Sequence, residues 1–196
     1  MELPKPSDCL PRSFYEQSTE TVAQQLIAKA IAHRVADVWV GGIITETEAY
    51  LGEADPASHS ARGRTKSNAS MFAHPGTLYV YPIHAKHCLN AVTESAGCGA
   101  AVLIRSIEPV WGVEKMRERR GFEELRRLTR GPAMLCQALA VDRSHDGIDI
   151  VEDQTFCIAD CDSDQPTIEA TARIGISKAK DLPLRFINRS SQFLSR

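Results

Sequence analysis

The segment Ile44-Thr45-Glu46-Thr47-Glu48-Ala49-Tyr50 sets the architecture of this chain. Successive side chains of a strand point to opposite faces of its sheet, so Glu46, Glu48 and Tyr50 are expected to share one face. The strand-like pattern begins at Val38. The sequence therefore predicts a strand over 38–50 that presents two carboxylates and a phenol on the same side.

A hairpin is predicted further along the chain. Thr77-Leu78-Tyr79-Val80-Tyr81 has both tyrosines on one face, and Cys88-Leu89-Asn90-Ala91-Val92 supplies the second strand, with His84-Ala85-Lys86 as the tip. The stretch 51–72 before the hairpin is polar and without period, so we expect a loop there.

A buried strand is predicted after the hairpin. The run Ala100-Ala101-Val102-Leu103-Ile104 is continuously apolar and ends at Arg105. A buried guanidinium needs an acidic partner or an anionic ligand, which makes Arg105 a candidate site residue. In the last third of the chain, short strands are expected over 171–176 and 184–187.

Helices are expected between these strands. Ser18 or Thr19 can cap a helix that runs to about His33, and two further helices are expected over 109–119 and 132–140. The strands and helices follow one another without a βαβ rhythm, and no linker separates two domains. We therefore expect a single α+β domain with an antiparallel sheet.

Composition and charge agree with one folded domain. The chain has 196 residues, of which 43% are apolar and 24% charged, and its net charge is −2. The overall basic charge of many nucleic-acid binders is missing. Residues 57–93 nevertheless contain no Asp or Glu, and they carry Arg62, Arg64, Lys66, Lys86 and four of the six histidines. A locally positive face can bind phosphates while the rest of the molecule is acidic.

The sequence shows neither a signal peptide nor an apolar run of about 18 residues, so we expect a cytoplasmic protein that does not bind membranes. Its six cysteines are scattered and form no Cys-x-x-Cys pair. We expect free, buried thiols rather than disulfides or a zinc site.

Several polar and aromatic side chains are candidates for a site. For Glu46 we favour the ordinary explanation of a glutamate on the solvated face of a strand, and tyrosines in strands fit ordinary sheet packing. Together the candidates suggest a cleft for a planar substrate. They are Glu46, Glu48, Tyr50, His59, Tyr81, His84, His87 and Arg105.

A metal site is the obvious competitor. His84-x-x-His87 could bind a metal together with Glu46 or Glu48. The spacing lies at a predicted hairpin tip and lacks the helical His-Glu-x-x-His arrangement, so it is weak evidence for a metal.

Several motifs, in one order along the chain, resemble the alkyladenine (3-methyladenine) DNA glycosylase family. They lie at residues 45–52, 55–60, 71–72, 75–81, 103–105, 108–109, 131–132, 135–139 and 183–186. The resemblance runs from about residue 12 to residue 193. A series of long motifs is far more specific than any single short pattern.

The resemblance implies a curved, mainly antiparallel sheet surrounded by helices. It implies one catalytic domain over residues 1–196, with residues 1–11 as a poorly ordered N-terminal extension. It further implies no metal and no organic cofactor, double-stranded DNA containing damaged purines as the partner, and a monomer. In a bacterium such a protein would be associated with the nucleoid.

The resemblance also assigns residue roles. Glu48 would be the general base that activates a water, and Arg105 would help to hold that water. Tyr50, His59 and Tyr81 would line the pocket for a flipped base, and Asn90 would disfavour the exocyclic amine of guanine.

Three residues are assigned to the DNA itself. His84 stands where the family usually has an intercalating tyrosine, so its wedge role is the largest departure from the family pattern. Arg64 is expected to contact a phosphate, and Lys86 is expected to face the groove.

The function implied is that of a monofunctional DNA glycosylase for alkylated or deaminated purines such as 3-methyladenine, 7-methylguanine, hypoxanthine and ethenoadenine. The motifs contain no lysine for a Schiff base, so the reaction is expected to stop at an abasic site. Two alternatives stay open: a non-catalytic module that binds damaged nucleic acid, and a metal-dependent hydrolase for a small molecule.

Overall fold

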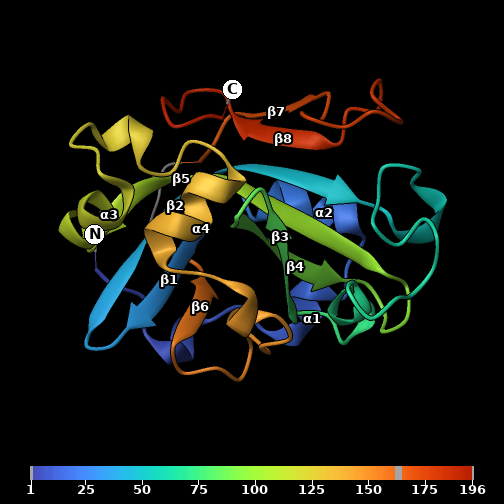
Figure 1. Ribbon diagram of the computed structural model, residues 1–196, viewed down its shortest axis with the longest axis horizontal. Helices are drawn as coiled ribbons and strands as arrows, with labels where there is room; N and C mark the ends of the chain where they lie inside the picture. The colour runs from blue at the N-terminus through green and yellow to red at the C-terminus, as the bar shows by residue number, and fades with distance from the viewer. Residues whose placement is uncertain (1, 162–164, 196) are drawn as a thin grey trace.

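The computed structural model describes residues 2–161 and 165–195. Eight strands in these residues form one curved antiparallel sheet in the order β3-β4-β5-β2-β1-β6, and β8 pairs with both β2 and β7 (Figure 1). The strands are β1 (Ala30–Val35), β2 (Val38–Tyr50), β3 (Leu78–Ile83), β4 (Lys86–Thr93), β5 (Ala100–Trp111), β6 (Phe156–Ala159), β7 (Ile168–Thr171) and β8 (Arg185–Asn188).

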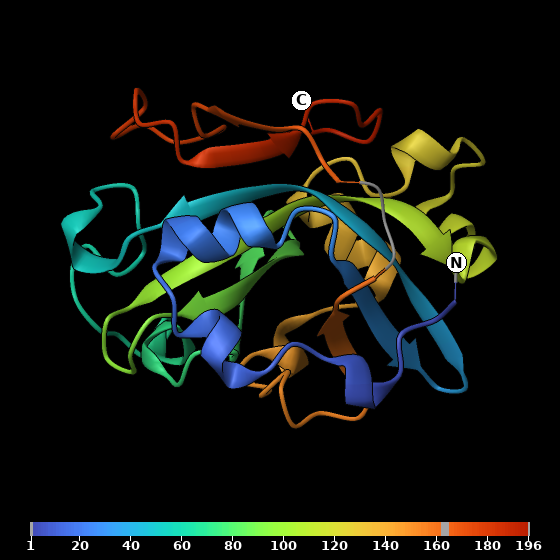
Figure 2. The same ribbon diagram turned by 180° about the vertical axis from the view of Figure 1, so that it is seen from behind.

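Helices cover both sides of the sheet, which confirms the predicted α+β class. Helix α4 lies in front of the sheet in Figure 1, and α1 and α2 lie in front of it when the molecule is seen from behind in Figure 2. The α-helices are α1 (Arg12–Tyr15), α2 (Thr19–Gln25), α3 (Val113–Arg120) and α4 (Pro132–Leu139). Short 3-10 helices lie at η1 (Pro6–Asp8), η2 (Gly52–Ala54), η3 (Ala69–Phe72), η4 (Leu125–Arg127) and η5 (Arg143–His145).

The predicted strand and hairpin are confirmed. Strand β2 spans the expected residues, and β3 pairs with β4 around a tip at His84 and Ala85. Both tip residues have positive φ, at 44° and 60°, as the two central residues of a tight hairpin turn require. The loop 51–72 contains only short 3-10 turns.

The first predicted helix is wrong in its second half. Helix α2 ends at Gln25, Ala28 has a left-handed φ of 70°, and β1 begins at Ala30. This strand pairs with β2 on one side and with β6 on the other. Backbone pairing on both sides, with Ala30, Ile31 and Ala32 fully buried, outweighs the i, i+4, i+8 spacing of Val22, Leu26 and Ala30 that predicted a helix.

Two other boundaries also differ from expectation. Residues 109–111 continue β5, so α3 begins only at Val113, after Gly112 in a left-handed conformation. The strand expected over 171–176 is β7, which ends at Thr171. Residues 172–176 instead form the start of a loop.

The prediction of free, buried thiols is wrong for one disulfide-bonded pair, and Cys98 and Cys161 are less buried than expected. Cys9 and Cys157 form a disulfide that links the N-terminal segment to β6. Cys88 and Cys136 are free and buried as expected, but Cys98 is free and exposed. Sequence could not indicate the disulfide because its two cysteines are 148 positions apart.

The segment 1–11, expected to be a poorly ordered extension, packs against β6 where the structure describes it. Leu10 is buried, and its N–H donates to the Ile158 carbonyl at 2.8 Å. Cys9 makes a β-bridge to Ala159. Met1 lies outside the described residues. In the described part of the chain, every helix is too short or too polar to cross a membrane.

Candidate active site

A cavity of about 500 Å³ opens beside the end of β2 and the β3–β4 hairpin. Strands β4 and β5 contribute Cys88, Asn90, Leu103 and Arg105 to its lining. The loop that follows β7 contributes residues 174–178. The cavity therefore joins segments more than 100 positions apart in the sequence.

Glu48 is fully buried next to this cavity, and its carboxylate is held on three sides. Oε1 accepts from the Ile174 backbone N–H at 2.8 Å and pairs with Arg105 Nη1 at 3.1 Å. Oε2 accepts from the Tyr50 hydroxyl at 2.8 Å. The shared face predicted from the strand alternation is thus confirmed by a direct contact between Glu48 and Tyr50.

Glu46 is fully buried rather than solvated, which corrects the ordinary explanation favoured from its sequence position. Its Oε1 accepts from Arg105 Nε at 2.9 Å, Arg185 Nε at 2.6 Å and the Ser195 hydroxyl at 2.7 Å, and its Oε2 accepts from the Ser195 N–H at 2.5 Å. Burial alone would raise the pKa of Glu46, but the hydrogen bonds from Ser195 and the charge of Arg105 outweigh it and lower the pKa.

Arg105 joins the two glutamates. Its side chain is 7% exposed, and its guanidinium contacts both carboxylates. Burial would lower the pKa of Arg105, but the charges of Glu48 and Glu46 raise it, so the group stays cationic. This confirms the expectation that a buried guanidinium at the end of the apolar strand needs acidic partners.

Aromatic rings form much of the cavity lining. His59 packs edge-on against Tyr81 with ring centroids 4.5 Å apart, and its Nδ1 is hydrogen-bonded to the Tyr79 hydroxyl at 2.8 Å. Tyr50 completes the set. Burial lowers the pKa of His59, so a neutral ring is favoured. Burial raises the pKa of Tyr50, Tyr79 and Tyr81, and for Tyr79 to about 12, so their hydroxyls stay protonated.

Asn90 is buried at the cavity with a fixed orientation. Its Nδ2 donates to the Tyr79 carbonyl at 2.9 Å. This bond engages one of the two amide donors and fixes the direction of the side chain.

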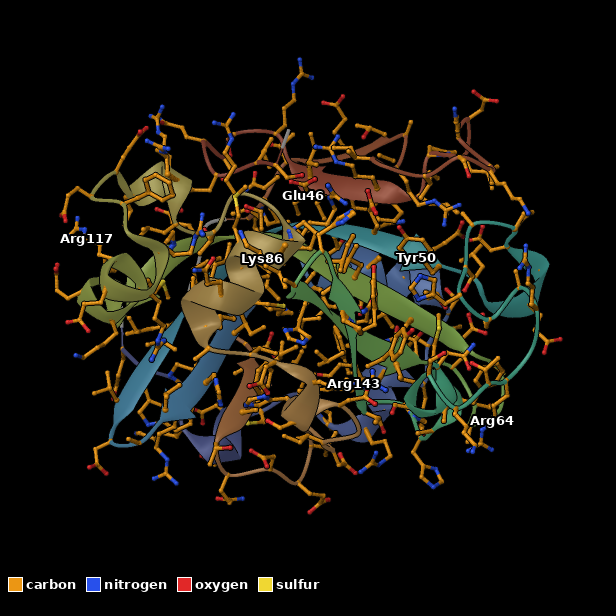
Figure 3. All side chains as sticks on the ribbon, viewed as in Figure 1. Glu46, Tyr50, Arg64, Lys86, Arg117 and Arg143 are labelled. Carbon is orange, nitrogen blue, oxygen red and sulfur yellow. A yellow bond between two sulfur atoms is a disulfide. The ribbon has the colours of Figure 1, made fainter. Side chains whose placement is uncertain are left out.

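The residues expected to contact DNA lie outside the cavity lining. His84 and Lys86 are exposed at the hairpin tip, and Arg64 is exposed on the loop 51–72. Figure 3 labels Lys86 over the middle of the molecule and Arg64 near its lower right edge. Ile83, beside His84, lines the cavity and is 38% exposed, so the tip also presents an apolar side chain.

Sequence reasoning missed Arg173 and Asp55. Arg173 is buried and forms a two-pronged ion pair with Asp55, and its guanidinium lies 4.8 Å from the centre of the Tyr50 ring. It also donates to the Ala49 carbonyl. It thereby ties the loop that carries His59 to the strand that carries Glu48. The polar context of both residues in the sequence gave no signal of this pairing.

Lys178 and Ser195 were also missed. Lys178 lines the cavity mouth, although the motifs themselves contain no lysine. Ser195 contacts Arg105 and Glu46 from a position at the far end of the sequence. Neither residue stands in a patterned segment.

No group of three or more His, Cys, Asp or Glu side chains in the described residues could hold a metal ion. The set of His84, His87 and Glu46 or Glu48 considered from the sequence is therefore not assembled. Glu46 and Glu48 are engaged with arginines instead.

Comparison of the sequence with known proteins identifies a family. The methylpurine-DNA glycosylase family model matches residues 13–192. The chain belongs to this family. Among similar proteins, one from Rhodopirellula baltica, named "Putative 3-methyladenine DNA glycosylase", is 50% identical over 192 residues, which cover 95% of this chain and 82% of that protein. Proteins with the same name from Methanoculleus marisnigri and Koribacter versatilis are 44% and 41% identical, over 95% of this chain and 98% and 92% of theirs. Family membership confirms the resemblance seen in the sequence motifs.

Proposed function

We propose that this chain is a monofunctional DNA glycosylase that flips a damaged purine into the aromatic cavity and hydrolyses its N-glycosidic bond. The observation that carries the proposal is a buried carboxylate, Glu48, held by Arg105 beside a cavity lined with aromatic rings. A glycosylase cannot reach the sugar–base bond inside the stack, so it needs a pocket for an extruded base. The cavity has the flat apolar walls that such a base requires.

Glu48, and not Glu46, is the proposed general base. A carboxylate has about four acceptor sites. Glu46 already accepts four hydrogen bonds, whereas Glu48 accepts the Ile174 N–H, the Tyr50 hydroxyl and the Arg105 contact. Glu48 therefore keeps acceptor capacity for one water. Arg105 lines the cavity and would hold that water from the other side.

The chemistry follows from this placement. The water oxygen bonds to C1′ of the flipped nucleotide, the water proton passes to Glu48, and the electron pair of the C–N bond leaves with the base. A cationic base such as 3-methyladenine or 7-methylguanine leaves as a neutral molecule. A neutral lesion such as hypoxanthine or ethenoadenine also needs hydrogen bonds to the departing base.

The aromatic lining supports selection of cationic lesions. Stacking of a positively charged purine on an electron-rich ring adds about 0.5–2 kcal/mol over a neutral base. His59, with its lowered pKa, offers a neutral ring that does not repel the cation. Asn90 would disfavour normal guanine because its side chain, held in place by the bond to the Tyr79 carbonyl, would crowd the exocyclic amine.

The proposed partner is double-stranded DNA bound by a monomer. His84 would enter the gap left by the flipped nucleotide, and Lys86 and Arg64 would contact the backbone. A protein of this type needs no metal and no organic cofactor. Its proposed location is the cytoplasm, or the nucleoid region of a bacterium.

Release of hypoxanthine from a duplex tests the proposal. A labelled duplex with one hypoxanthine is incubated with the protein and then treated with alkali, which cleaves only at abasic sites. We expect strand breaks only in samples that are treated with alkali after incubation with the protein, and none in samples without alkali. Binding to the damaged duplex without alkali-labile sites would instead support the non-catalytic binding module. Excision that needs added metal would support the hydrolase.

A further inference from the structure

The segment 193–195 lies against the two strands that carry the central ion pairs. The Phe193 carbonyl accepts from Thr45 Oγ1 at 2.7 Å and from Ser106 Oγ at 2.6 Å. These residues directly precede Glu46 and directly follow Arg105. The segment is thus fixed to β2 and β5 at the level of the site.

The pairing of β2 and β5 is irregular at this point. Glu46 lies opposite Ser106 and Thr47 lies opposite Ile104, so Arg105 has no opposite residue in the register. A β-bulge of this kind re-aims a side chain and weakens the local ladder. The hydrogen bonds from 193–195 meet the sheet where the ladder between β2 and β5 is least regular.

Ser195 makes the closest contacts with the re-aimed side chain. Its Oγ accepts from Arg105 Nη2 at 2.9 Å and from Nε at 3.2 Å, and donates to Glu46 Oε1 at 2.7 Å. Ser195 is only 9% exposed. The hydroxyl therefore bridges the guanidinium and the carboxylate of one buried ion pair.

These contacts determine which nitrogen of Arg105 faces Glu48. A guanidinium is planar, so acceptors on Nε and Nη2 fix the direction of Nη1. Nη1 is the nitrogen that reaches Glu48 Oε1, at 3.1 Å. Without the Ser195 hydroxyl, Nη2 loses its acceptor, and the Glu46 contact through Nε alone leaves the plane of the group less constrained.

We propose that Ser195 is a positioning residue for base excision, which holds Arg105 in the orientation that serves Glu48. The proposal rests on the proposed function, because Ser195 acts only through these two residues. Ser195 lies beyond the residues 13–192 that the family model matches. The support of Arg105 from this segment is therefore an inference about this chain and not one drawn from the family.

The first test compares Ser195→Ala with Ser195→Thr, which keeps a hydroxyl. Single-turnover release of hypoxanthine should slow roughly tenfold in Ser195→Ala, since a hydrogen bond to a charged group is removed, and should recover in Ser195→Thr. Affinity for a duplex with a stable abasic analogue should not change. Ser190→Ala is the matched control, because Ser190 is exposed and its hydroxyl, within the part of the chain that the structure describes, bonds only to Asn188 Oδ1.

A double-mutant cycle shows whether Ser195 acts through Arg105. Lysine at position 105 keeps the charge but lacks the planar fork, so Ser195→Ala should cause no further loss in the Arg105→Lys background. Equal fractional losses in both backgrounds, or a normal rate in Ser195→Ala, would overturn the inference. Continued activity of Glu48→Gln would overturn the proposed function instead, so the two failures can be told apart.

Discussion

At the scale of the residue, Glu46 and Glu48 are chemically the same side chain, two positions apart on one face of β2. Their surroundings separate them. The Glu46 carboxylate accepts hydrogen bonds from two arginines and from the N–H and the hydroxyl of Ser195. The Glu48 carboxylate pairs with one arginine and accepts hydrogen bonds from one backbone N–H and one phenol. One carboxylate is saturated as a structural anion, and the other keeps room for a water.

Glu48→Gln should nearly abolish base release while binding of damaged DNA persists. The amide keeps the shape of the side chain but cannot accept the water proton, and loss of a general base typically costs about 10²–10⁴-fold in rate. Single-turnover excision and affinity for a duplex with an abasic analogue are the measurements. Excision at the normal rate would remove Glu48 from the mechanism.

Glu46→Gln should mainly change stability, in a way that depends on pH. Because the pKa of Glu46 is lowered in the folded state, its ionised form stabilises the fold fully above the usual glutamate pKa of about 4.3. That contribution is lost as the pH falls through the lowered folded pKa. Unfolding by urea at a series of pH values should show a smaller loss of stability on acidification in Glu46→Gln than in the original chain. If the free energy of unfolding falls equally with pH in both proteins, Glu46 is not the group whose protonation destabilises the fold.

Lys178 provides a specific test of the expectation that the enzyme is monofunctional. It lines the cavity mouth, so an amine is present near the flipped nucleotide after all. We still expect no strand cleavage, because the proposed roles of Glu48 and Arg105 make water the nucleophile, and because Lys178 is exposed. Borohydride treatment during turnover should trap no covalent DNA adduct. An adduct that disappears in Lys178→Gln would make this chain a lyase as well.

At the scale of the element, the β3–β4 hairpin combines an exposed tip with buried residues that line the cavity. Tyr79 and Tyr81 of β3 line the cavity, while His84 and Ala85 at the tip form a tight turn in left-handed conformations. The same element can therefore hold a flipped base and reach into the DNA groove beside it.

His84 should act as a weak wedge. Stacking of a base on an aromatic side chain contributes about 1–3 kcal/mol, and imidazole offers a smaller face than phenol. His84→Tyr should tighten binding of an abasic duplex, and His84→Ala should weaken it. Identical dissociation constants for all three proteins would mean that Ile83, which is exposed beside the tip, or His87 fills the gap left by the flipped nucleotide.

The elements near the site were predictable where local pattern decides them. Strict alternation placed Glu48 and Tyr50 on one face, and the apolar run ending at Arg105 indicated a buried cation. Tertiary pairing decides what local pattern could not. Ala30 continues the helical spacing of Val22 and Leu26, but it belongs to a strand that is paired on both sides, and Ser195 reaches Glu46 across 149 positions. Contacts of that range leave no periodic signal in a single sequence.

At the scale of the whole molecule, a net charge of −2 has to be reconciled with a DNA substrate. The distribution of charge does this. Arg62, Arg64 and Lys66 lie on the loop 51–72 and Lys86 lies beside the hairpin tip, and residues 57–93 contain no Asp or Glu. Arg117 on α3 is engaged with Glu114 and lies at the opposite edge of the molecule from Arg64 in Figure 3. Within the described residues Arg62, Arg64, Lys66 and Lys86 form no ion pair, whereas Arg117 is paired with Glu114 and Glu123.

The salt dependence of DNA binding tests this separation. The logarithm of the binding constant falls with the logarithm of salt concentration, with a slope of about −0.9 for each phosphate contacted. Arg64→Ala and Lys86→Ala should each weaken binding of undamaged and damaged duplexes alike and should each reduce the slope by about 1. Arg117→Ala should leave the slope unchanged, because its charge is already paired on the far edge. Titration of labelled duplexes across a range of salt concentrations gives all three slopes. A change of slope in Arg117→Ala equal to that in Arg64→Ala would mean that the DNA crosses α3, and the orientation of the duplex over the cavity would have to be redrawn.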